Sequence, residues 1–276
     1  MDLYCVMGHP VEHSRSPWIH ARFAALTGQT LSYGRRLAPL DAFAQTLDTF
    51  RAEPGARGCN VTVPFKFDAL RIAHYVSPRA ALAQAANVLS FDSNGIHADN
   101  SDGVGLVRDV TRHAGVALDG ADVLLLGGGG AAAGVLGPLL EAGTRRVVVA
   151  NRTPAKALAL ARRHALLACE RHASVETQPL SAITGSYNLV INATASSLAG
   201  VAMPLAGSVL KRGALAIDLM YGPPAVGFLT WARDHDAVAR DGLGMLVEQA
   251  AEAFEIWRGV RPPTAGVLAE LRRSMG

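Results

Sequence analysis

The feature that most constrains the fold of this chain is a glycine cluster directly after a short apolar run. Val123–Leu126 is continuously apolar, which is typical of a strand buried on both faces of a parallel sheet. Gly127–Gly130 follow at once, and a helix is expected over Val135–Leu140. The spacing G-x-G-x-x-A, beginning at Gly127, lets the backbone turn tightly and approach a pyrophosphate at a helix N-terminus. The order strand, glycines, helix and second strand predicts a Rossmann-type dinucleotide site.

The end of the second strand of this predicted unit indicates which dinucleotide binds. Arg146–Ala150 is expected to be that strand, and Asn151-Arg152-Thr153-Pro154 follows it. A site for NAD usually has Asp or Glu here to bind the ribose 2′-hydroxyl, and this chain has none. A guanidinium at Arg152, with Lys156 nearby, suits a 2′-phosphate. A solvated arginine at a helix start is the alternative, and the upstream glycines favour NADP.

The cofactor residues expected from this reading lie in two adjacent loops. Thr153 and Pro154 are expected as the N-cap and first residue of the next helix, which adds backbone amides for a phosphate. The residues of the two loops that we expect to contact the cofactor are Gly127, Gly128, Gly129, Gly130, Ala131, Asn151, Arg152, Thr153 and Lys156.

Strand-like and helix-like segments alternate along most of the chain, which predicts an α/β fold with largely parallel sheets. From Asp122 onward the apolar strands are continuous rather than alternating, and we place the main domain boundary near residue 102. We expect residues 1–101 and 242–276 to form an N-terminal α/β substrate domain, with C-terminal helices returning to it. Residues 102–241 are expected to be the inserted Rossmann-type domain. Asp92-Ser-Asn-Gly95 predicts a hairpin turn within the first domain.

Composition excludes several other classes of protein. The 276 residues include no apolar block longer than about 10, well short of a membrane span, and the first 20 residues lack a signal-peptide pattern, so a cytoplasmic enzyme is expected. The net charge is +3 with no Lys/Arg run longer than two, so no nucleic-acid partner is expected. Three cysteines without CxxC spacing argue against a metal site, and Cys5 and Cys59 are expected to be buried. A monomer and a homodimer both remain open.

Several short polar clusters lie in apolar surroundings in the first domain and near the C-terminus. Each has an ordinary structural explanation when taken alone. Ser16 and Asp102 are good helix-start residues, Lys66 suits a solvated loop, and Gln249 suits the polar face of a helix. The clusters are Ser14-Arg-Ser16-Pro17, Asn60-Val-Thr62-Val-Pro-Phe-Lys66, Asn87, Asp99-Asn-Ser-Asp102-Gly103 and Asp241-Gly242-Leu-Gly-Met245-Leu-Val-Glu-Gln249.

Taken together and in this order, with the glycine loop and Asn151-Arg152-Thr153, these clusters resemble the shikimate dehydrogenase family over the whole chain. The resemblance implies reversible NADPH-dependent reduction of 3-dehydroshikimate to shikimate, a step of aromatic amino-acid biosynthesis. It implies a catalytic pair, Lys66 and Asp102. It also implies that Ser14 and Ser16 bind the substrate carboxylate, that Tyr221 is a substrate residue near that carboxylate, and that Thr62, Asn87, Asp102 and Gln249 bind the ring hydroxyls. Thr194, Gly242 and Met245 match positions that line the cofactor.

The implied catalytic pair suits the chemistry of an alcohol dehydrogenase. Oxidation of a secondary alcohol requires loss of the hydroxyl proton as hydride leaves, and the reverse reaction protonates an alkoxide. An ammonium donates to that oxygen, while a neighbouring carboxylate holds the ammonium in place. Whether Lys66 or Asp102 formally transfers the proton stays open, because a coupled pair shares it.

The chain departs from the family pattern at His9, Val88, Ala98 and Ala133 and over residues 222–227. Two alternatives therefore stay open. One is a quinate/shikimate dehydrogenase of broader specificity, and the other is a diverged NADPH-binding paralogue without catalysis. Retention of Lys66 and Asp102 argues against the second, and Asn151-Arg152 argues against use of NAD.

Overall fold

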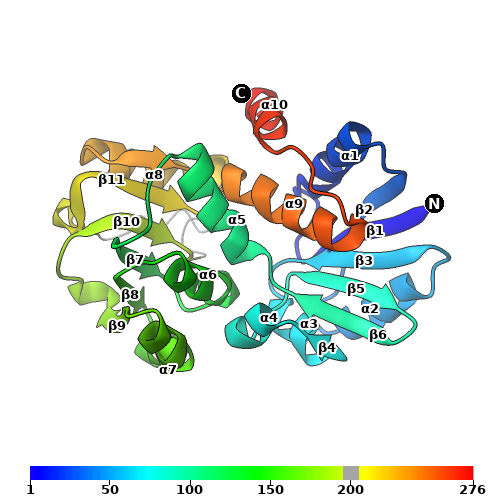
Figure 1. The fold of residues 1–276 in the computed structure, drawn as a ribbon, viewed down its shortest axis with the longest axis horizontal. Helices are drawn as coiled ribbons and strands as arrows, with labels where there is room; N and C mark the ends of the chain where they lie inside the picture. Colours follow the sequence, from blue (N-terminus) through cyan, green and yellow to red (C-terminus); the bar gives the residue numbers. More distant parts are fainter. Residues whose placement is uncertain (195–204, 276) are drawn as a thin grey trace. The chain divides into compact units, whose positions relative to one another are not determined.

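The structure, a computed structural model, describes residues 1–194 and 205–275. It divides into two compact units. Unit 1 comprises residues 1–105 and 246–274, and unit 2 comprises residues 106–245. The boundaries predicted from the sequence fall after residues 101 and 241. Figure 1 shows the elements of each unit, coloured along the chain.

Unit 1 is built on a mixed six-stranded sheet. Its strands are ordered β2-β1-β3-β5-β6-β4. The strands are β1 (Asp2–Gly8), β2 (Leu31–Leu37), β3 (Ala56–Val61), β4 (Tyr75–Val76), β5 (Val88–Asp92) and β6 (Gly95–Asp99). The helices are α1 (Ser16–Thr27), α2 (Phe43–Arg51), α3 (Lys66–Arg71), α4 (Pro78–Ala83), the start of α5 (Asp102–Arg108), most of α9 (Leu243–Arg258), and α10 (Ala265–Ser274).

The strand directions in unit 1 depend on one short turn. Strands β2, β1 and β3 are parallel, but β5 is antiparallel to both β3 and β6. The hairpin predicted between β5 and β6 is confirmed: Asp92 pairs with Gly95, which has a φ of +135°, and the Asp92 carboxylate accepts the backbone N–H groups of Asn94 and Gly95. The two-residue turn Ser93-Asn94 reverses the chain between Asp92 and Gly95, so β5 and β6 are antiparallel.

Helices cover both faces of the unit 1 sheet. Successive strand residues point to opposite faces, so β1 contributes to two cores. On one face, Cys5 and Met7 pack with Phe43 and Phe65 of the α2 and α3 region. On the other, Tyr4 stacks on Trp257 of α9, 4.6 Å between ring centroids. The predicted burial of Cys5 and Cys59 is confirmed, and both are free thiols.

Unit 2 has a fully parallel sheet in its described residues. The order is β12-β11-β10-β7-β8-β9, the doubly wound arrangement of dinucleotide-binding proteins. The strands are β7 (Asp122–Leu126), β8 (Arg146–Asn151), β9 (Ser174–Pro179), β10 (Tyr187–Asn192), β11 (Leu210–Asp218) and β12 (Val238–Arg240). The helices are α6 (Gly130–Glu141), α7 (Pro154–Glu170) and α8 (Val226–Asp234), together with a π-helical turn over Asp109–His113 that follows α5.

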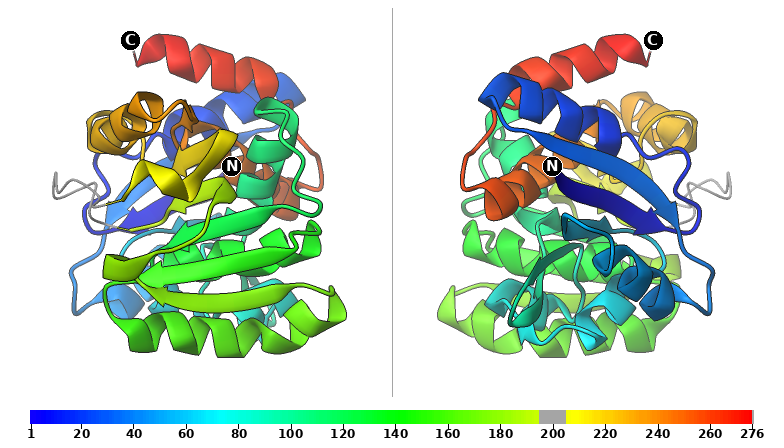
Figure 2. Two further views of the ribbon diagram at one scale, coloured as in Figure 1. Left: turned by 90° about the vertical axis from the view of Figure 1, so that its left-hand side faces the viewer. Right: turned by 90° about the vertical axis from the view of Figure 1, so that its right-hand side faces the viewer.

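The core of unit 2 lies on the strands that the sequence marks as continuously apolar. All five residues of β7 are buried, as expected for a central strand covered on both faces. Leu124 and Val148 pack with Phe228 of α8 on one face. Figure 2 shows the strands of this sheet side by side, with α7 running along the β8–β9 side.

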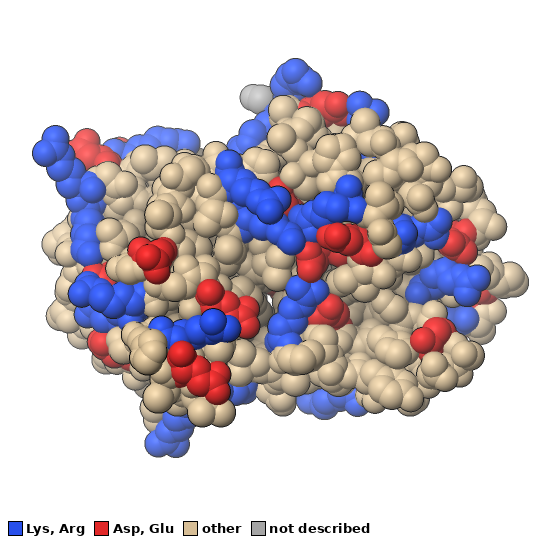
Figure 3. All heavy atoms as spheres, in the orientation of Figure 1, with Lys and Arg blue, Asp and Glu red and all other residues tan. Residues whose placement is uncertain are grey.

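Two surface properties of the described residues bear on the predicted class of protein. No helix among them is long and apolar enough to span a membrane. On the face drawn in Figure 3, Lys and Arg side chains are interspersed with Asp, Glu and uncharged ones.

One histidine of unit 1 is enclosed in an aromatic cluster. His20 is completely buried and stacks on Tyr33, with the ring centroids 4.1 Å apart and the planes at 5°. Phe23 and Phe254 lie about it, at 6.0 Å and 6.1 Å between centroids. Burial lowers the pKa of His20 to about 3, against a smaller opposing effect of Asn60. His20 is therefore neutral in the folded protein at every pH near neutrality.

We expect His20 to make the fold sensitive to acid. Below about pH 6.5, its ordinary pKa, His20 is protonated in the unfolded chain. In the folded chain it stays neutral until the pH falls to about 3. The free energy of unfolding therefore falls as the pH drops through this window, by up to about 1.4 kcal/mol per pH unit from this group. In His20→Phe the urea-unfolding free energy should depend less on pH between 6.5 and 4 than in the wild type. Equal pH slopes in the two proteins would contradict the burial of a neutral His20.

Candidate active site

Three chain segments of unit 1 meet at one end of its sheet. Asn60, near the end of β3, pairs with Val88 at the start of β5, and Val88 pairs with Asp99 at the end of β6. Because β5 runs antiparallel to both neighbours, its beginning lies beside their ends. In α/β sheets the loops beyond the carboxyl ends of the parallel strands form the binding crevice. Residues 60–66, 87 and 99–102 are brought to that end.

Lys66 and Asp102 form an ion pair at this end of the sheet. The Lys66 Nζ lies 2.6 Å from Asp102 Oδ2, and the two side chains are only 15% and 6% exposed. Lys66 begins α3 and Asp102 begins α5, so both positions are fixed by helix starts. The Asp102 backbone N–H donates to Asn100 Oδ1 at 3.0 Å. Removing one partner of so enclosed a pair leaves an uncompensated charge, which is costly.

Asn87 is the centre of a hydrogen-bond network around this pair. Its Nδ2 lies 2.8 Å from Asp102 Oδ1, 3.1 Å from Ser101 Oγ and 3.3 Å from Gln249 Oε1. Its Oδ1 accepts the Ser101 backbone N–H at 2.8 Å. An amide nitrogen has two protons, so these three acceptors share them. The structure thus brings together Lys66, Asn87, Asp102 and Gln249, four of the residues singled out from the sequence.

Two hydrogen bonds connect Tyr33 through Asn60 to the backbone of Asn87. The Tyr33 hydroxyl donates to Asn60 Oδ1 at 2.7 Å, and Asn60 Nδ2 donates to the Asn87 carbonyl at 3.1 Å. Burial raises the pKa of Tyr33 well above its ordinary value, so the phenol stays protonated as a donor. Asn60, Tyr33 and Ser101 are not among the site residues predicted from the sequence. Asn60 and Ser101 lie inside the polar motifs described above, whereas Tyr33 lies in a separate strand with no motif.

Ser14, Ser16 and Thr62 occupy loops beyond β1 and β3. The Ser14 hydroxyl donates to Ser16 Oγ at 3.2 Å, and Ser16 is buried at the start of α1. The Thr62 backbone N–H donates to the Met7 carbonyl of β1 at 2.9 Å. A Cβ on Gly8 would lie 2.3 Å from Thr62 Cγ2, so the glycine at the end of β1 leaves the room that Thr62 occupies.

Two positions where the chain departs from the family pattern now have a structural account. The Val88 side chain is completely buried in β5, so it packs in the core next to Asn87. His9 Nδ1 lies 3.0 Å from the Ala38 carbonyl, a contact that ties the loop after β1 to the end of β2.

The glycine loop of unit 2 is shaped for a phosphate. Gly127 directly follows β7 with a φ of +119°, and a Cβ there would lie 3.0 Å from the Ala193 carbonyl oxygen. Gly129 is the N-cap of α6, and a Cβ on it would meet only open space. The first backbone N–H groups of a helix have no partner within it, and they favour an anion. Gly128, Gly130 and Ala131 complete this turn, and the fully buried Ala132 allows the close packing expected of the pattern.

The turn after β8 presents its basic residues to solvent. Asn151 ends β8 and donates from Nδ2 to the Thr153 carbonyl at 3.0 Å. Thr153 is the N-cap of α7 and Pro154 its first residue, as predicted, although the Thr153 side chain makes no capping hydrogen bond. Arg152 and Lys156 are exposed, and neither forms an ion pair with a carboxylate in the part of the chain that the structure describes. Both cations are available to a phosphate.

The remaining predicted cofactor residues lie around β10 and the loop before α9. Thr194 donates from its backbone and its hydroxyl to Asn192 Oδ1, at 3.1 Å and 2.8 Å. A Cβ on Gly242 would lie 2.3 Å from the Leu219 carbonyl oxygen, so only glycine fits there. Met245 is buried in the first turn of α9. Tyr221, predicted to bind the substrate, is half-buried after β11 and belongs to unit 2, unlike the other predicted substrate residues.

We expect alanine substitution at two glycines of the loop to have different effects, one on thermal stability and the other on cofactor affinity. Gly127→Ala places a side chain at φ +119° against the Ala193 carbonyl, so it should lower the melting temperature. Gly129→Ala has an ordinary φ of −93° and open space, so the melting temperature should be kept while cofactor affinity falls, because the methyl group occupies the approach to the helix start. Thermal melting and cofactor titration of both variants test this. Equal melting temperatures, or unchanged affinity in Gly129→Ala, would contradict it.

A doubly wound sheet with a glycine-rich phosphate turn, and a separate unit holding an enclosed Lys–Asp pair, define a dinucleotide-dependent oxidoreductase. Comparison with protein families agrees. Residues 6–89 match the shikimate dehydrogenase substrate binding domain, residues 109–220 the shikimate / quinate 5-dehydrogenase family, and residues 242–272 the shikimate 5′-dehydrogenase C-terminal domain. The chain belongs to the shikimate dehydrogenase family.

Relatives of known name match nearly the whole chain. The shikimate dehydrogenase (NADP(+)) of Methylibium petroleiphilum is 62% identical, over 98% of this chain and 94% of the relative. That of Paracidovorax citrulli is 62% identical, over 99% and 98%. Among solved structures, an Ael1 enzyme from Pseudomonas putida has a TM-score of 0.88 and 45% identity, covering 98% of each chain. Shikimate 5-dehydrogenase from Thermus thermophilus, in complex with NADP(H) and shikimate, has a TM-score of 0.86 and 33% identity, covering 99% and 100%. The family and fold predicted from the motifs are thereby confirmed.

Proposed function

We propose that this chain catalyses the reversible, NADPH-dependent reduction of 3-dehydroshikimate to shikimate, a step of aromatic amino-acid biosynthesis. The observation that carries the proposal is the enclosed Lys66–Asp102 ion pair, with Asn87 bound to the free oxygen of its carboxylate. It is supported by the matching names of relatives that are 62% identical over nearly the whole length of the chain.

Lys66 and Asp102 handle the proton. NADPH, when bound, supplies the hydride that goes to the carbonyl carbon. The Lys66 ammonium donates a hydrogen bond to the carbonyl oxygen and stabilises the negative charge that develops there. Asp102 keeps that ammonium in place through Oδ2, and Asn87 in turn fixes Asp102 through Oδ1. The proton that completes the alcohol comes from this pair, which shares it.

The polar side chains around the pair bind the substrate. Ser14 and Ser16 bind the carboxylate, and Thr62, Asn87, Asp102 and Gln249 bind the ring hydroxyls. Such a site rejects analogues that lack a hydroxyl, because its buried donors and acceptors are then left unpaired. Of these groups, Asn87, Asp102 and Gln249 already share hydrogen bonds, which a polyol exchanges for its own.

The cofactor is NADP(H). The Gly127–Gly130 turn and the start of α6 receive its pyrophosphate, and Arg152 with Lys156 receives the 2′-phosphate. Asn151 at the end of β8 leaves this site without the carboxylate that would repel a 2′-phosphate. Thr194, Gly242 and Met245 line the remainder of the dinucleotide site.

A broader quinate/shikimate dehydrogenase is the second candidate function. It is favoured by the match of residues 109–220 to a family that includes quinate enzymes. A non-catalytic paralogue is disfavoured, because both members of the Lys66–Asp102 pair are present and paired.

The test is the absorbance at 340 nm of purified protein offered shikimate or quinate, each with NADP⁺ or NAD⁺. Rapid reduction with shikimate and NADP⁺ alone would support the main proposal. Comparable rates with quinate would favour the broader enzyme. No turnover in any combination, despite binding of NADPH, would overturn the proposal in favour of a non-catalytic paralogue.

A further inference from the structure

A second charged cluster of unit 1 lies close to the candidate active site but outside it. Arg79, in α4, binds the Asp99 carboxylate in a bidentate manner: Nε lies 2.6 Å from Oδ1 and Nη2 lies 2.8 Å from Oδ2. Its third nitrogen, Nη1, donates to Glu252 Oε1 of α9 at 2.8 Å. The Arg79 and Asp99 side chains are 27% and 21% exposed. Arg79 thus joins the end of β6 to α9.

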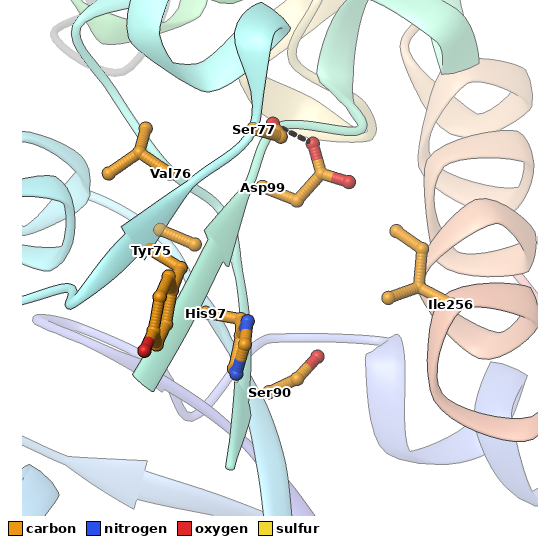
Figure 4. Close-up of a pocket in the computed structure, with 8 residues that line it drawn as sticks. Tyr75, Val76, Ser77, Ser90, His97, Asp99 and Ile256 are labelled. Atoms are coloured by element: carbon orange, nitrogen blue, oxygen red, sulfur yellow. Dashed lines mark hydrogen bonds between the residues drawn. The ribbon is translucent and has the colours of Figure 1, made fainter. Parts of the chain in front are cut away.

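The end of β6 and α9 lie on opposite sides of an open space beside the Arg79 bridge. A pocket of about 290 Å³ separates them, lined by Asp99, Ser77, Ser90 and His97 from the sheet side and by Ile256 of α9 from the other. Figure 4 shows Ile256 across the pocket from these residues, and the hydrogen bond from Ser77 to Asp99 at its rim. Across this gap the bridge is ionic, and a bidentate arginine–carboxylate pair is the strong and directional form of such a bridge.

Asp99 and Glu252, the two carboxylates that Arg79 binds, each lie three residues from a proposed substrate-binding residue, Asp102 and Gln249. Asp99 Oδ1 accepts the Asn100 backbone N–H at 2.7 Å, and Asn100 Oδ1 accepts the backbone N–H of Asp102 at 3.0 Å. On the other side, Glu252 is one turn beyond Gln249 on α9, and its second oxygen binds Arg261, which also binds Glu248. Although burial opposes it, binding of Arg79 and Ser77 lowers the pKa of Asp99, so the carboxylate stays charged.

We propose that Arg79 is a positioning residue, which holds the Asn100–Asp102 segment and the Gln249 turn of α9 at the separation that the substrate requires. The proposal rests on the proposed function for its choice of substrate. Arg79 touches neither Lys66 nor Asp102, and it acts through Asp99 and Glu252. A displacement of about 1 Å between catalytic and binding groups lowers catalytic efficiency by roughly 100-fold.

The experiment compares Arg79→Gln and Arg79→Lys with a matched control, Arg22→Gln. Arg22 forms the same bidentate pair with Glu270, at 2.8 Å and 2.9 Å, and it ties α1 to α10; neither residue belongs to the proposed site. We expect Arg79→Gln to lower kcat/KM for shikimate by roughly 10- to 100-fold, with KM for NADP⁺ unchanged. Arg79→Lys keeps the charge but cannot form the bidentate pair, so its kcat/KM should lie between those of Arg79→Gln and the wild type. Arg22→Gln should keep wild-type kinetics.

Hydrogen–deuterium exchange of the same proteins provides a readout that needs no turnover. Amides of residues 99–105 should exchange faster in Arg79→Gln than in Arg22→Gln or the wild type. If the wild type does not oxidise shikimate, the proposed function is wrong. The positioning role of Arg79 is then tested by the hydrogen–deuterium exchange alone. Equal exchange in these residues would overturn the positioning role. So would a loss of kcat/KM in Arg79→Gln no larger than that in Arg22→Gln, or an Arg79→Lys variant as impaired as Arg79→Gln.

Discussion

Replacing Lys66 by alanine is expected to lower kcat with shikimate and NADP⁺ by about 10²- to 10⁴-fold, the usual contribution of a positioned general acid–base. The substitution removes the ammonium that lies 2.6 Å from Asp102 and leaves that carboxylate, 6% exposed, with Asn87 as its remaining side-chain partner. The fold should persist, because Lys66 lies at the start of α3, outside the apolar clusters of unit 1. Steady-state kinetics at 340 nm and circular dichroism measure the two effects separately.

The control for this loss is Lys156→Ala, which removes an exposed lysine from the proposed cofactor site. That variant should raise KM for NADP⁺ and keep kcat. A near-normal kcat in Lys66→Ala, or the same kinetic pattern in both variants, would refute the proposed role of Lys66. Loss of the circular dichroism signal would shift the test to Lys66→Met, which keeps most of the side-chain volume.

The second large effect concerns the choice of cofactor. Arg152→Ala should weaken the binding of NADP⁺ by about 10- to 100-fold and leave the binding of NAD⁺ nearly unchanged. Hydrogen bonds to charged groups contribute roughly 1.5–3 kcal/mol, and each 1.4 kcal/mol is a factor of ten in affinity. Arg152 is exposed at the start of α7, and NAD⁺ has no 2′-phosphate for it to bind. The measurement is the ratio of kcat/KM for the two cofactors.

Arg162→Ala is the matched control, because it removes an exposed arginine further along α7 and should leave that ratio unchanged. Adding Asn151→Asp to Arg152→Ala should move the preference further towards NAD⁺, because a carboxylate at the end of β8 repels the phosphate and accepts from a ribose hydroxyl. An equal loss with both cofactors in Arg152→Ala would mean that Arg152 does not bind the 2′-phosphate.

The sequence predicted the elements whose residues carry a clear hydrophobic pattern. The strands predicted over Val123–Leu126 and Arg146–Ala150 each lie within one residue of β7 and β8 in the structure. Strand β9 was missed because Ser174, Glu176 and Gln178 give it little apolar character; it is an edge strand held by its pairing with β8. The start of β11 shows no clear strand pattern in the sequence, because Lys211, Arg212 and Gly213 interrupt its apolar run at the point where its register with β10 shifts.

The candidate site was predictable where short motifs mark it and not where tertiary contacts make it. Lys66, Asn87, Asp102 and Gln249 come from four separate stretches, and their grouping was inferred from the family resemblance before the structure brought them together. Arg79 carries no such motif. Its place depends on the direction of β6 and on the return of α9, and neither is encoded in the residues next to it.

The return of residues 246–274 to unit 1 has a consequence for the order in which the molecule is made. A ribosome adds about 5–20 residues per second, so roughly 7 to 28 s of synthesis of unit 2 separate the two parts of unit 1. During that time Tyr4, His20 and Phe23 lack the Phe254 and Trp257 side chains that cover them in the folded protein. The nascent chain therefore exposes these aromatic side chains until α9 has been made, and Gln249 reaches Asn87 only after the whole of unit 2 has been synthesised.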